Sequence, residues 1–151
     1  TLFRNRYLKG EVELELVPQG TLVDRIRAGG TGLGGFYTPT GVGTELAAGK
    51  ETRIIDGREY LFELPLKADF VFLKAHLGDR LGNLVYRGTM RNFNVVMATA
   101  GKTVLAEVDR LVPAGEIPPE HVHTPGIFVD HLVQVDRHPK LLELPKEEAA
   151  T

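Results

Sequence analysis

The sequence predicts an open α/β fold, and three patterns support this prediction. Polar and apolar residues alternate over Glu11–Val17, as they do in a strand with one buried face. The next segment, Thr21–Ala28, has apolar side chains at helical spacing and charged side chains on its other side. Several apolar, β-branched segments follow. The 151 residues, 42% hydrophobic and 25% charged, suit one globular domain and are not typical of a disordered chain or a membrane span.

The joint between this strand and this helix is a candidate ligand site. Pro18 ends the strand, and Gly29-Gly30 is expected to stop the helix. In open α/β sheets the turns that follow strands line the ligand crevice. Gln19 lies in this turn, and its amide can donate a hydrogen bond to an oxyanion or a carboxylate. A helix-capping or surface role for Gln19 is the alternative, and the residues alone leave it open.

A glycine-rich segment follows the predicted helix. Eight of the 17 glycines fall between Gly29 and Gly49. Within it, Gly30–Gly35 matches the G-x-G-x-x-G pattern of dinucleotide-binding folds. That pattern must follow a strand and open a helix, whereas here a helix precedes it. The segment is better interpreted as a loop that allows a ligand or a partner chain to approach the backbone closely.

The rest of the chain predicts further strands and one short helix. Asp56-Gly57 lies between two apolar segments and is a strong hairpin signal. Residues 136–151 mix charge with proline and are expected to form a mobile tail. The other predicted elements are a buried strand over Ala68–Leu77, a strand over Leu84–Tyr86, a helix over Phe93–Ala100 capped by Asn92 and ended by Gly101, and strands over Thr103–Val112 and Ile127–Val135.

The composition excludes several kinds of chemistry. The chain has 0 Cys, and no serine occurs between Thr1 and Thr151. Serine and cysteine nucleophiles, disulfides and thiolate metal sites are therefore excluded. The formal charge of -2, with basic residues spread along the chain, does not support nucleic-acid binding. Without a targeting segment, the expected location is the cytoplasm.

Two further clusters of polar residues have simple interpretations. The histidines His121, His123, His131 and His138 could suggest a metal site. Glu120 and Asp130 are the only carboxylates at ligand spacing from them, whereas a metal site needs several convergent ligands. We interpret them as surface histidines near a proline-rich turn and predict no metal. The glutamates of Glu11–Val17 alternate with apolar residues, so they are expected to form the solvated face of the strand.

Eight short motifs occur in one order and spacing along nearly the whole chain. They are Tyr7–Leu22, Arg25–Gly30, Phe36–Thr44, Ala68–Phe70, Gly82–Arg87, Arg91–Asn94, Glu107–Val108 and His123–Val129. This series, from about Leu2 to Val133, resembles the A (alpha) subunit of the 3-oxoacid CoA-transferases, which include the succinyl-CoA:3-ketoacid and 3-oxoadipate enzymes.

The resemblance implies a fold and an activity. The fold is an open α/β/α sheet, and the activity is transfer of CoA from succinyl-CoA to a free 3-oxo acid, acetoacetate or 3-oxoadipate. In this family a glutamate of the B subunit, in a Ser-Glu-Asn-Gly-like motif, forms the glutamyl-CoA intermediate. This chain has no serine, so that motif is absent. The implied partner is a B subunit in an A2B2 hetero-oligomer, and CoA is a substrate, with no other cofactor.

The resemblance also implies an incomplete subunit. In this family the alpha chain opens with a Gly-Gly-Phe-Gly-containing strand and an Asn-Asn pair near the active site, and neither occurs here. Residues 1–135 are therefore expected to be the C-terminal portion of the alpha-subunit domain, inactive alone and dependent on another chain to cover its sheet edge.

Few site residues carry over from the resemblance. Gln19 matches the family glutamine that points toward the substrate carboxyl group or oxyanion, and Phe36, Tyr37 and Thr38 match a substrate-binding loop beside the cleft. Asn92 and Asn94 match family positions, but capping explains them equally well.

Two other hypotheses are weaker. A non-catalytic α/β module would bind a phosphorylated ligand through Gly29–Gly49. A relative of the sugar-phosphate isomerases or deaminases would share the general fold.

Overall fold

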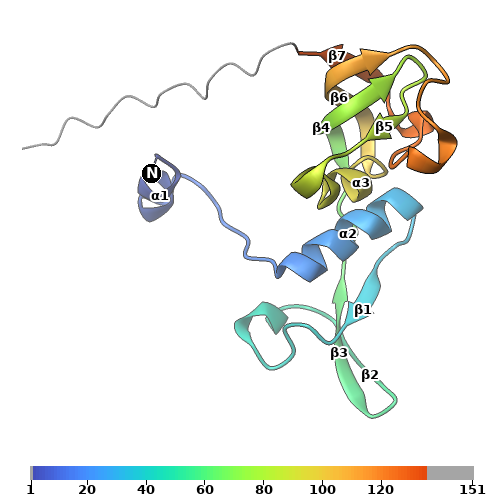
Figure 1. Cartoon of the computed structure of the whole chain (residues 1–151). Helices are drawn as coiled ribbons and strands as arrows, with labels where there is room; N and C mark the ends of the chain where they lie inside the picture. Colours follow the sequence, from blue (N-terminus) through green and yellow to red (C-terminus); the bar gives the residue numbers. More distant parts are fainter. Residues whose placement is uncertain (1, 136–151) are drawn as a thin grey trace, which may run out of the picture. The chain divides into compact units, whose positions relative to one another are not determined.

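The computed structural model describes residues 2–135 and divides the chain into two compact units (Figure 1). The first unit ends at Leu66 and the second begins at Lys67. Within residues 2–135, no helix is both long enough and apolar enough to cross a membrane. The predicted tail, 136–151, lies outside the described residues.

The first unit combines helices with a small antiparallel sheet. Its strands pair in the order β1-β3-β2. Its elements are α1 (Leu2–Leu8), α2 (Gln19–Thr31), β1 (Phe36–Thr38), the 3-10 helix η1 (Glu45–Ala47), β2 (Thr52–Ile55) and β3 (Arg58–Glu63).

The predicted strand over Glu11–Val17 is wrong. The segment is irregular and pairs with no strand among residues 2–135, and its Leu14 and Leu16 are 42% and 71% exposed. A strand requires a neighbouring strand for its backbone hydrogen bonds, and alternation alone does not supply one.

The predicted first helix is confirmed, but both of its ends differ from the prediction. It begins at Gln19, two residues early, and runs through Gly29-Gly30 to Thr31. Gly32 ends it in the left-handed conformation, with φ of 77°. A residue with a side chain is strained in this conformation, so a glycine is favoured at the position where the helix ends. The helix therefore stops at Gly32 and not at Gly29-Gly30.

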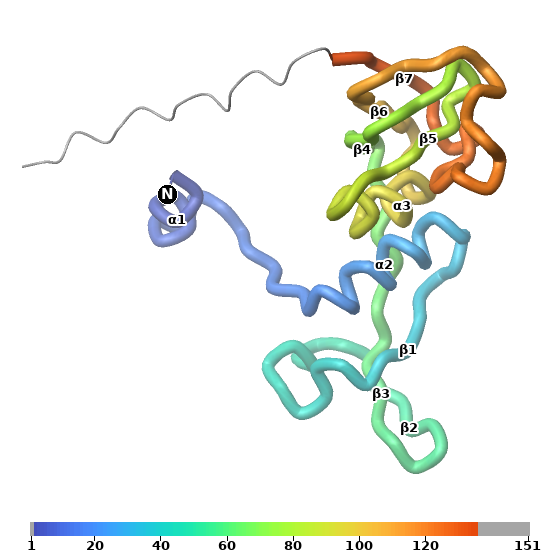
Figure 2. The backbone as a smooth tube through the Cα atoms, in the orientation of Figure 1, coloured from blue at the N-terminus to red at the C-terminus, as the bar shows by residue number. Residues whose placement is uncertain are grey.

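The hairpin is confirmed. Ile55 pairs with Arg58 across a two-residue turn, which the backbone trace shows as a tight reversal between β2 and β3 (Figure 2). Asp56 and Gly57 both have positive φ, 48° and 76°, as a type I′ turn requires.

The second unit is a four-stranded sheet in the order β5-β4-β6-β7. Strands β4, β6 and β7 run parallel, and β5 is antiparallel to β4. The elements are β4 (Ala68–Asp79), β5 (Leu84–Val85), η2 (Gly88–Arg91), α3 (Asn94–Met97), β6 (Gly101–Val112), η3 (Pro119–His121), η4 (Gly126–Phe128) and β7 (His131–Gln134). Parallel strands joined through helical connections confirm the α/β class.

The core of this unit lies on one face of the sheet. Leu73 and Ala75 on β4 lie beside Ala106 and Val108 on β6, and all four are buried. The alternate side chains of β4 point the other way, and Phe72 is 71% exposed. The prediction that the whole strand is buried is therefore wrong for this second face.

Two predicted elements of the second unit are shorter than expected. Helix α3 covers only Asn94–Met97, and Phe93, not Asn92, precedes it without a side-chain cap. Asn94 donates to the Lys74 carbonyl at 2.8 Å, which ties the helix to the sheet. Strand β7 covers only His131–Gln134, because the preceding residues form the short helix η4.

Candidate functional site

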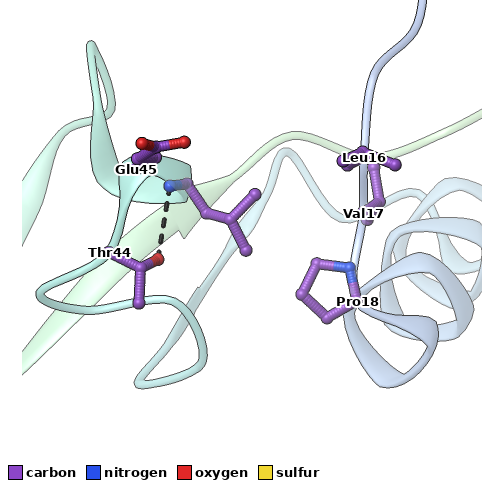
Figure 3. A pocket seen from close by; sticks show the side chains of 6 residues that line it. Leu16, Val17, Pro18, Thr44 and Glu45 are labelled. Atoms are coloured by element: carbon purple, nitrogen blue, oxygen red, sulfur yellow. Dashed lines mark hydrogen bonds between the residues drawn. The ribbon is translucent and has the colours of Figure 1, made fainter.

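A pocket of about 560 Å³ lies immediately before helix α2 (Figure 3). One wall is the irregular segment that ends at Pro18, and the opposite wall is the loop that carries η1. The lining is mostly apolar and consists of Leu16, Val17, Pro18, Thr44, Glu45 and Leu46.

Glycines and one threonine shape the loop wall. Gly41 and Gly43 have φ of 90° and 74°, which favours glycine over any residue with a side chain. The Thr44 hydroxyl donates to the Gly41 carbonyl at 2.7 Å. It also accepts the Leu46 N–H at 3.3 Å, and this second bond is the dashed line in Figure 3. The predicted glycine-rich loop therefore brings Leu46 to the pocket.

Gln19 is the first residue of α2 and follows Pro18 of the pocket lining. Its side chain is exposed, and within residues 2–135 no hydrogen bond engages its amide. The structure therefore does not support a helix-capping role for the Gln19 side chain. The first backbone N–H groups of a helix are unpaired and carry partial positive charge, so Gln19 stands where an anionic oxygen is favoured.

The residues of β1 do not line this pocket. Tyr37 donates its hydroxyl proton to the Glu51 carboxylate and lies under the Arg53 guanidinium, 5.6 Å from the ring centroid. The hydrogen bond to Glu51 raises the pKa of Tyr37, as do desolvation and the charge of Glu51. Thr38 accepts the Thr40 N–H at 3.2 Å, and Phe36 pairs with β3. A substrate-lining role for Phe36, Tyr37 and Thr38 stays a prediction.

A charged hollow of about 270 Å³ in the same unit was not predicted from the sequence. Its most buried ionisable group is Glu63 on β3, which is 4% exposed and bonded to Lys50 at 2.5 Å. Arg25 on α2 bonds Glu15 at 2.8 Å and the Leu64 carbonyl at 3.0 Å. The sequence signal for this hollow was Glu63, a glutamate at an inward-facing strand position. The sequence alone does not distinguish such a glutamate from a surface residue, because the difference is its burial in the fold.

The histidines do not gather around a common point. His76 lies 3.3 Å from Asp109 on the outer sheet face, whereas His123 accepts the Tyr86 N–H at 2.8 Å. Among residues 2–135, no group of three or more metal-ligating side chains converges. His138 lies outside the described residues.

Comparison with known proteins places this geometry in a family. The family model for coenzyme A transferase matches residues 1–135. The alpha (A) chain of the 3-oxoadipate CoA-transferase of Pseudomonas putida is 58% identical over 134 residues, covering 89% of this chain and 58% of that protein. The corresponding chain of a probable succinyl-CoA:3-ketoacid coenzyme A transferase of Bacillus subtilis is 53% identical, covering 87% of this chain and 56% of that protein.

A solved structure agrees on the fold. The acyl-CoA transferase of Escherichia coli O157:H7 has a TM-score of 0.77 at 23% identity, covering 89% of this chain and 30% of that one. The chain thus spans less than three fifths of the curated relatives named above. With a family model matching residues 1–135, and with the open α/β fold shared, the chain belongs to the coenzyme A transferase family.

Proposed function

We propose that the chain is part of the alpha subunit of a 3-oxoacid CoA-transferase, which moves CoA from succinyl-CoA to a 3-oxo acid. The observation that supports this most strongly is the 58% identity to the alpha chain of a 3-oxoadipate CoA-transferase, with Gln19 beside an apolar pocket. Acetoacetate and 3-oxoadipate are both acceptors of the proposed class. The comparisons give no support to the phosphorylated-ligand module or to the isomerase alternative.

The proposed reaction proceeds through carboxylate chemistry on a partner chain. In the B subunit, a glutamate carboxylate attacks the succinyl-CoA carbonyl, and the CoA thiolate leaves to give a mixed anhydride. The thiolate then attacks the glutamyl carbonyl, which releases succinate and leaves a glutamyl-CoA thioester. The acceptor carboxylate repeats these two steps in reverse order. This chain has no serine and so lacks the Ser-Glu-Asn-Gly-like motif, which is consistent with a glutamate nucleophile supplied by another chain.

The role of Gln19 in this scheme is to stabilise negative charge. Each attack on a carbonyl places charge on its oxygen, and a preorganised N–H donor stabilises that oxyanion. The exposed amide of Gln19 and the N-terminus of the 13-residue helix α2 both favour an anionic oxygen at this place. The apolar pocket before Gln19, with Leu16 and Leu46, suits the carbon chain of the acid.

The complete activity needs more than this chain. The relatives are named as one of two kinds of subunit, and the chain spans 58% of one and 56% of another. We infer a hetero-oligomer with a B subunit, of A2B2 stoichiometry, working in the cytoplasm. Measuring the mass of the purified complex tests the stoichiometry, and any mass other than that of two copies of each subunit contradicts it.

The experiment that tests the role of Gln19 is a comparison of kcat and kcat/KM in the complex of a complete alpha subunit, which contains this sequence, with the B subunit. Gln19→Ala is expected to lower kcat about 100-fold, because one oxyanion donor is lost. Gln134→Ala is the matched control, since Gln134 is an exposed glutamine on β7, and it is expected to change kcat/KM less than twofold. An unchanged kcat/KM for Gln19→Ala shows that the role given to Gln19 is wrong.

A further inference from the structure

The sheet of the second unit has one face that the described part of the chain covers and one face that it does not. The covered face packs against Met90 of η2, Met97 of α3 and Phe128 of η4. The opposite face, here called the outer face, presents the side chains that alternate with the buried ones. Its apolar members are Phe70 and Phe72 on β4, Leu105 on β6 and Val133 on β7.

The apolar side chains of the outer face are more exposed than is usual in a sheet of parallel strands. Phe70, Phe72 and Val133 are 64%, 71% and 50% exposed. A hollow of about 250 Å³ lies beside Phe72, with Leu105, Val133 and Val135 in its lining. Parallel strands occur almost only in sheets that are covered on both faces, because exposed apolar side chains gain free energy when they leave water. The outer face is therefore expected to have a covering layer.

The charged residues of the outer face neutralise one another. Lys74 bonds the Glu107 and Asp109 carboxylates, each at 2.6 Å, and His76 lies 3.3 Å from Asp109. Although Glu107 also lines the hollow, its charge is thus already paired. These residues lie further along β4 and β6 than Phe72, so the region around Phe72 is apolar. Its covering layer is expected to present apolar side chains and not a complementary charge.

The backbone of β4 also has an open edge. On the side of β4 away from β6, the only strand within residues 2–135 is β5, and it pairs with Leu77 and Gly78. Earlier along β4, the Asn94 side chain donates to the Lys74 carbonyl at 2.8 Å. The preceding residues, Ala68–Leu73, have no strand on this side within the described part of the chain. Natural proteins pair or cover a strand edge of this kind.

One contiguous segment of strand and helix satisfies both features. A parallel strand joins a sheet through a crossover, usually a helix, that packs on one face of the sheet. The inner face is already covered, so the outer face is the one that remains for such a helix. A second copy of this chain satisfies only one feature. Pairing edge to edge would leave the outer face exposed, and packing face to face would leave the β4 edge open.

The rest of the alpha subunit is long enough to provide this segment. In the relative that is 58% identical, the 134 matched residues are 58% of the protein, so about 97 residues lie outside the match. A unit of two strands and a helix needs only about 30 residues. We propose that the outer face and the Ala68–Leu73 edge bind the rest of the alpha subunit, which adds a strand to the edge and places the apolar side of a helix over Phe72. This inference rests on the proposed function.

Thiol labelling at position 72 tests what covers the outer face. The chain has 0 Cys, so Phe72→Cys introduces a single thiol on this face. The 151-residue chain is compared with a complete alpha subunit that contains this sequence, both without the B subunit, and each protein without the substitution is the blank. In the chain, the thiol is expected to react nearly as fast as in urea. In the complete alpha subunit, it is expected to react about 100-fold more slowly or slower still.

Val71→Cys is the matched control. Val71 is the neighbouring residue on β4, but it belongs to the core and is 4% exposed. Its thiol is expected to be protected in both proteins, which also shows that the chain is folded. If it reacts freely in the chain, the rates at positions 71 and 72 in the complete alpha subunit decide the question, and both are expected to be slow.

Two further measurements test the same contact without a thiol. Phe72→Thr, which keeps a residue that favours a strand, is expected to lower the urea midpoint of the complete alpha subunit and to leave that of the 151-residue chain nearly unchanged. Amide hydrogen exchange over Ala68–Leu73 is expected to be slower in the complete alpha subunit than in the chain. Equal midpoint shifts in the two proteins, or equal exchange, would contradict the proposal.

The labelling results that overturn the proposal each identify a different arrangement. A thiol at position 72 that reacts freely in the complete alpha subunit leaves the outer face uncovered, and protection that appears only with the B subunit assigns the face to that subunit. Protection in the dilute 151-residue chain means that the chain covers its own face, and protection that rises with chain concentration means a second copy. An active complex with an accessible thiol contradicts this inference alone, whereas a protected thiol in an inactive complex contradicts only the proposed function.

Discussion

The side chain of Glu63 is the most deeply buried carboxylate of the first unit, and its partner Lys50 is partly exposed. Removing the Lys50 ammonium group leaves the buried Glu63 carboxylate without an opposite charge beside it. Lys50→Met is therefore expected to lower the free energy of unfolding by about 2 kcal/mol, less than for a fully buried pair because Lys50 reaches solvent. Urea denaturation of the chain measures this change.

The exposed pair Lys102–Asp69 provides the control for this prediction. Both side chains are more than 70% exposed, although they lie only 2.6 Å apart. Lys102→Met is expected to change the free energy of unfolding by less than about 0.5 kcal/mol. An equal decrease in the free energy of unfolding in Lys50→Met and Lys102→Met would contradict the claim that the burial of Glu63 makes its ion pair important.

The depressed pKa of His123 predicts a pH dependence of stability. Desolvation lowers the pKa of His123 below its ordinary value of 6.5, with Arg91 and His121 acting in the same direction. The unfolded chain therefore binds a proton at a higher pH than the folded chain, and stability is expected to fall as the pH decreases below about 6.5. Denaturation of the wild type and of His123→Phe between about pH 7.5 and pH 5 measures this; identical slopes would contradict it.

At the scale of elements, the first residue of η4 packs so closely against the turn after β4 that it has no room for a side chain. A Cβ on Gly126 would lie 2.0 Å from the Leu81 carbonyl oxygen, and its N–H is bonded to Asn83 at 2.9 Å. Gly126→Ala is expected to lower the free energy of unfolding by about 2 kcal/mol or more, because backbone must move. Thermal denaturation of the variant checks this expectation.

Gly20 is the matched control in a helix. A Cβ there would contact nothing within 4 Å, and its φ is not positive. Because alanine favours a helix over glycine, Gly20→Ala is expected to leave stability unchanged or to raise it by about 0.5 kcal/mol. A loss of stability in Gly20→Ala similar to that in Gly126→Ala would show that the close contact with Leu81 is not the cause.

The elements that the sequence predicts well are those with local signals. The hairpin was predictable because Asp56-Gly57 by itself favours a turn with two positive φ angles. The segment Glu11–Val17 has an equally clear strand pattern, but a strand depends on a partner that no local pattern reveals. The exposed outer face of β4 was missed for the same reason. An apolar run in the sequence does not show which of the two strand faces is covered by other residues.

At the scale of the whole molecule, the site was only partly predictable. The place of Gln19 follows from the turn that precedes a helix, which the sequence marks with Pro18. The contribution of Leu46 to the same pocket depends on the path of the glycine-rich loop and could not be read from the sequence.

The location of the covalent CoA intermediate tests the proposed function most directly. The complex of a complete alpha subunit, which contains this sequence, with the B subunit is incubated with succinyl-CoA in the absence of an acceptor acid, and the intact mass of each chain is measured. We predict a CoA thioester on the partner chain and none on this chain, formed about 100-fold more slowly in Gln19→Ala. A CoA adduct on this chain, or adduct formation at an unchanged rate in Gln19→Ala, would contradict the proposed division of labour between the two chains.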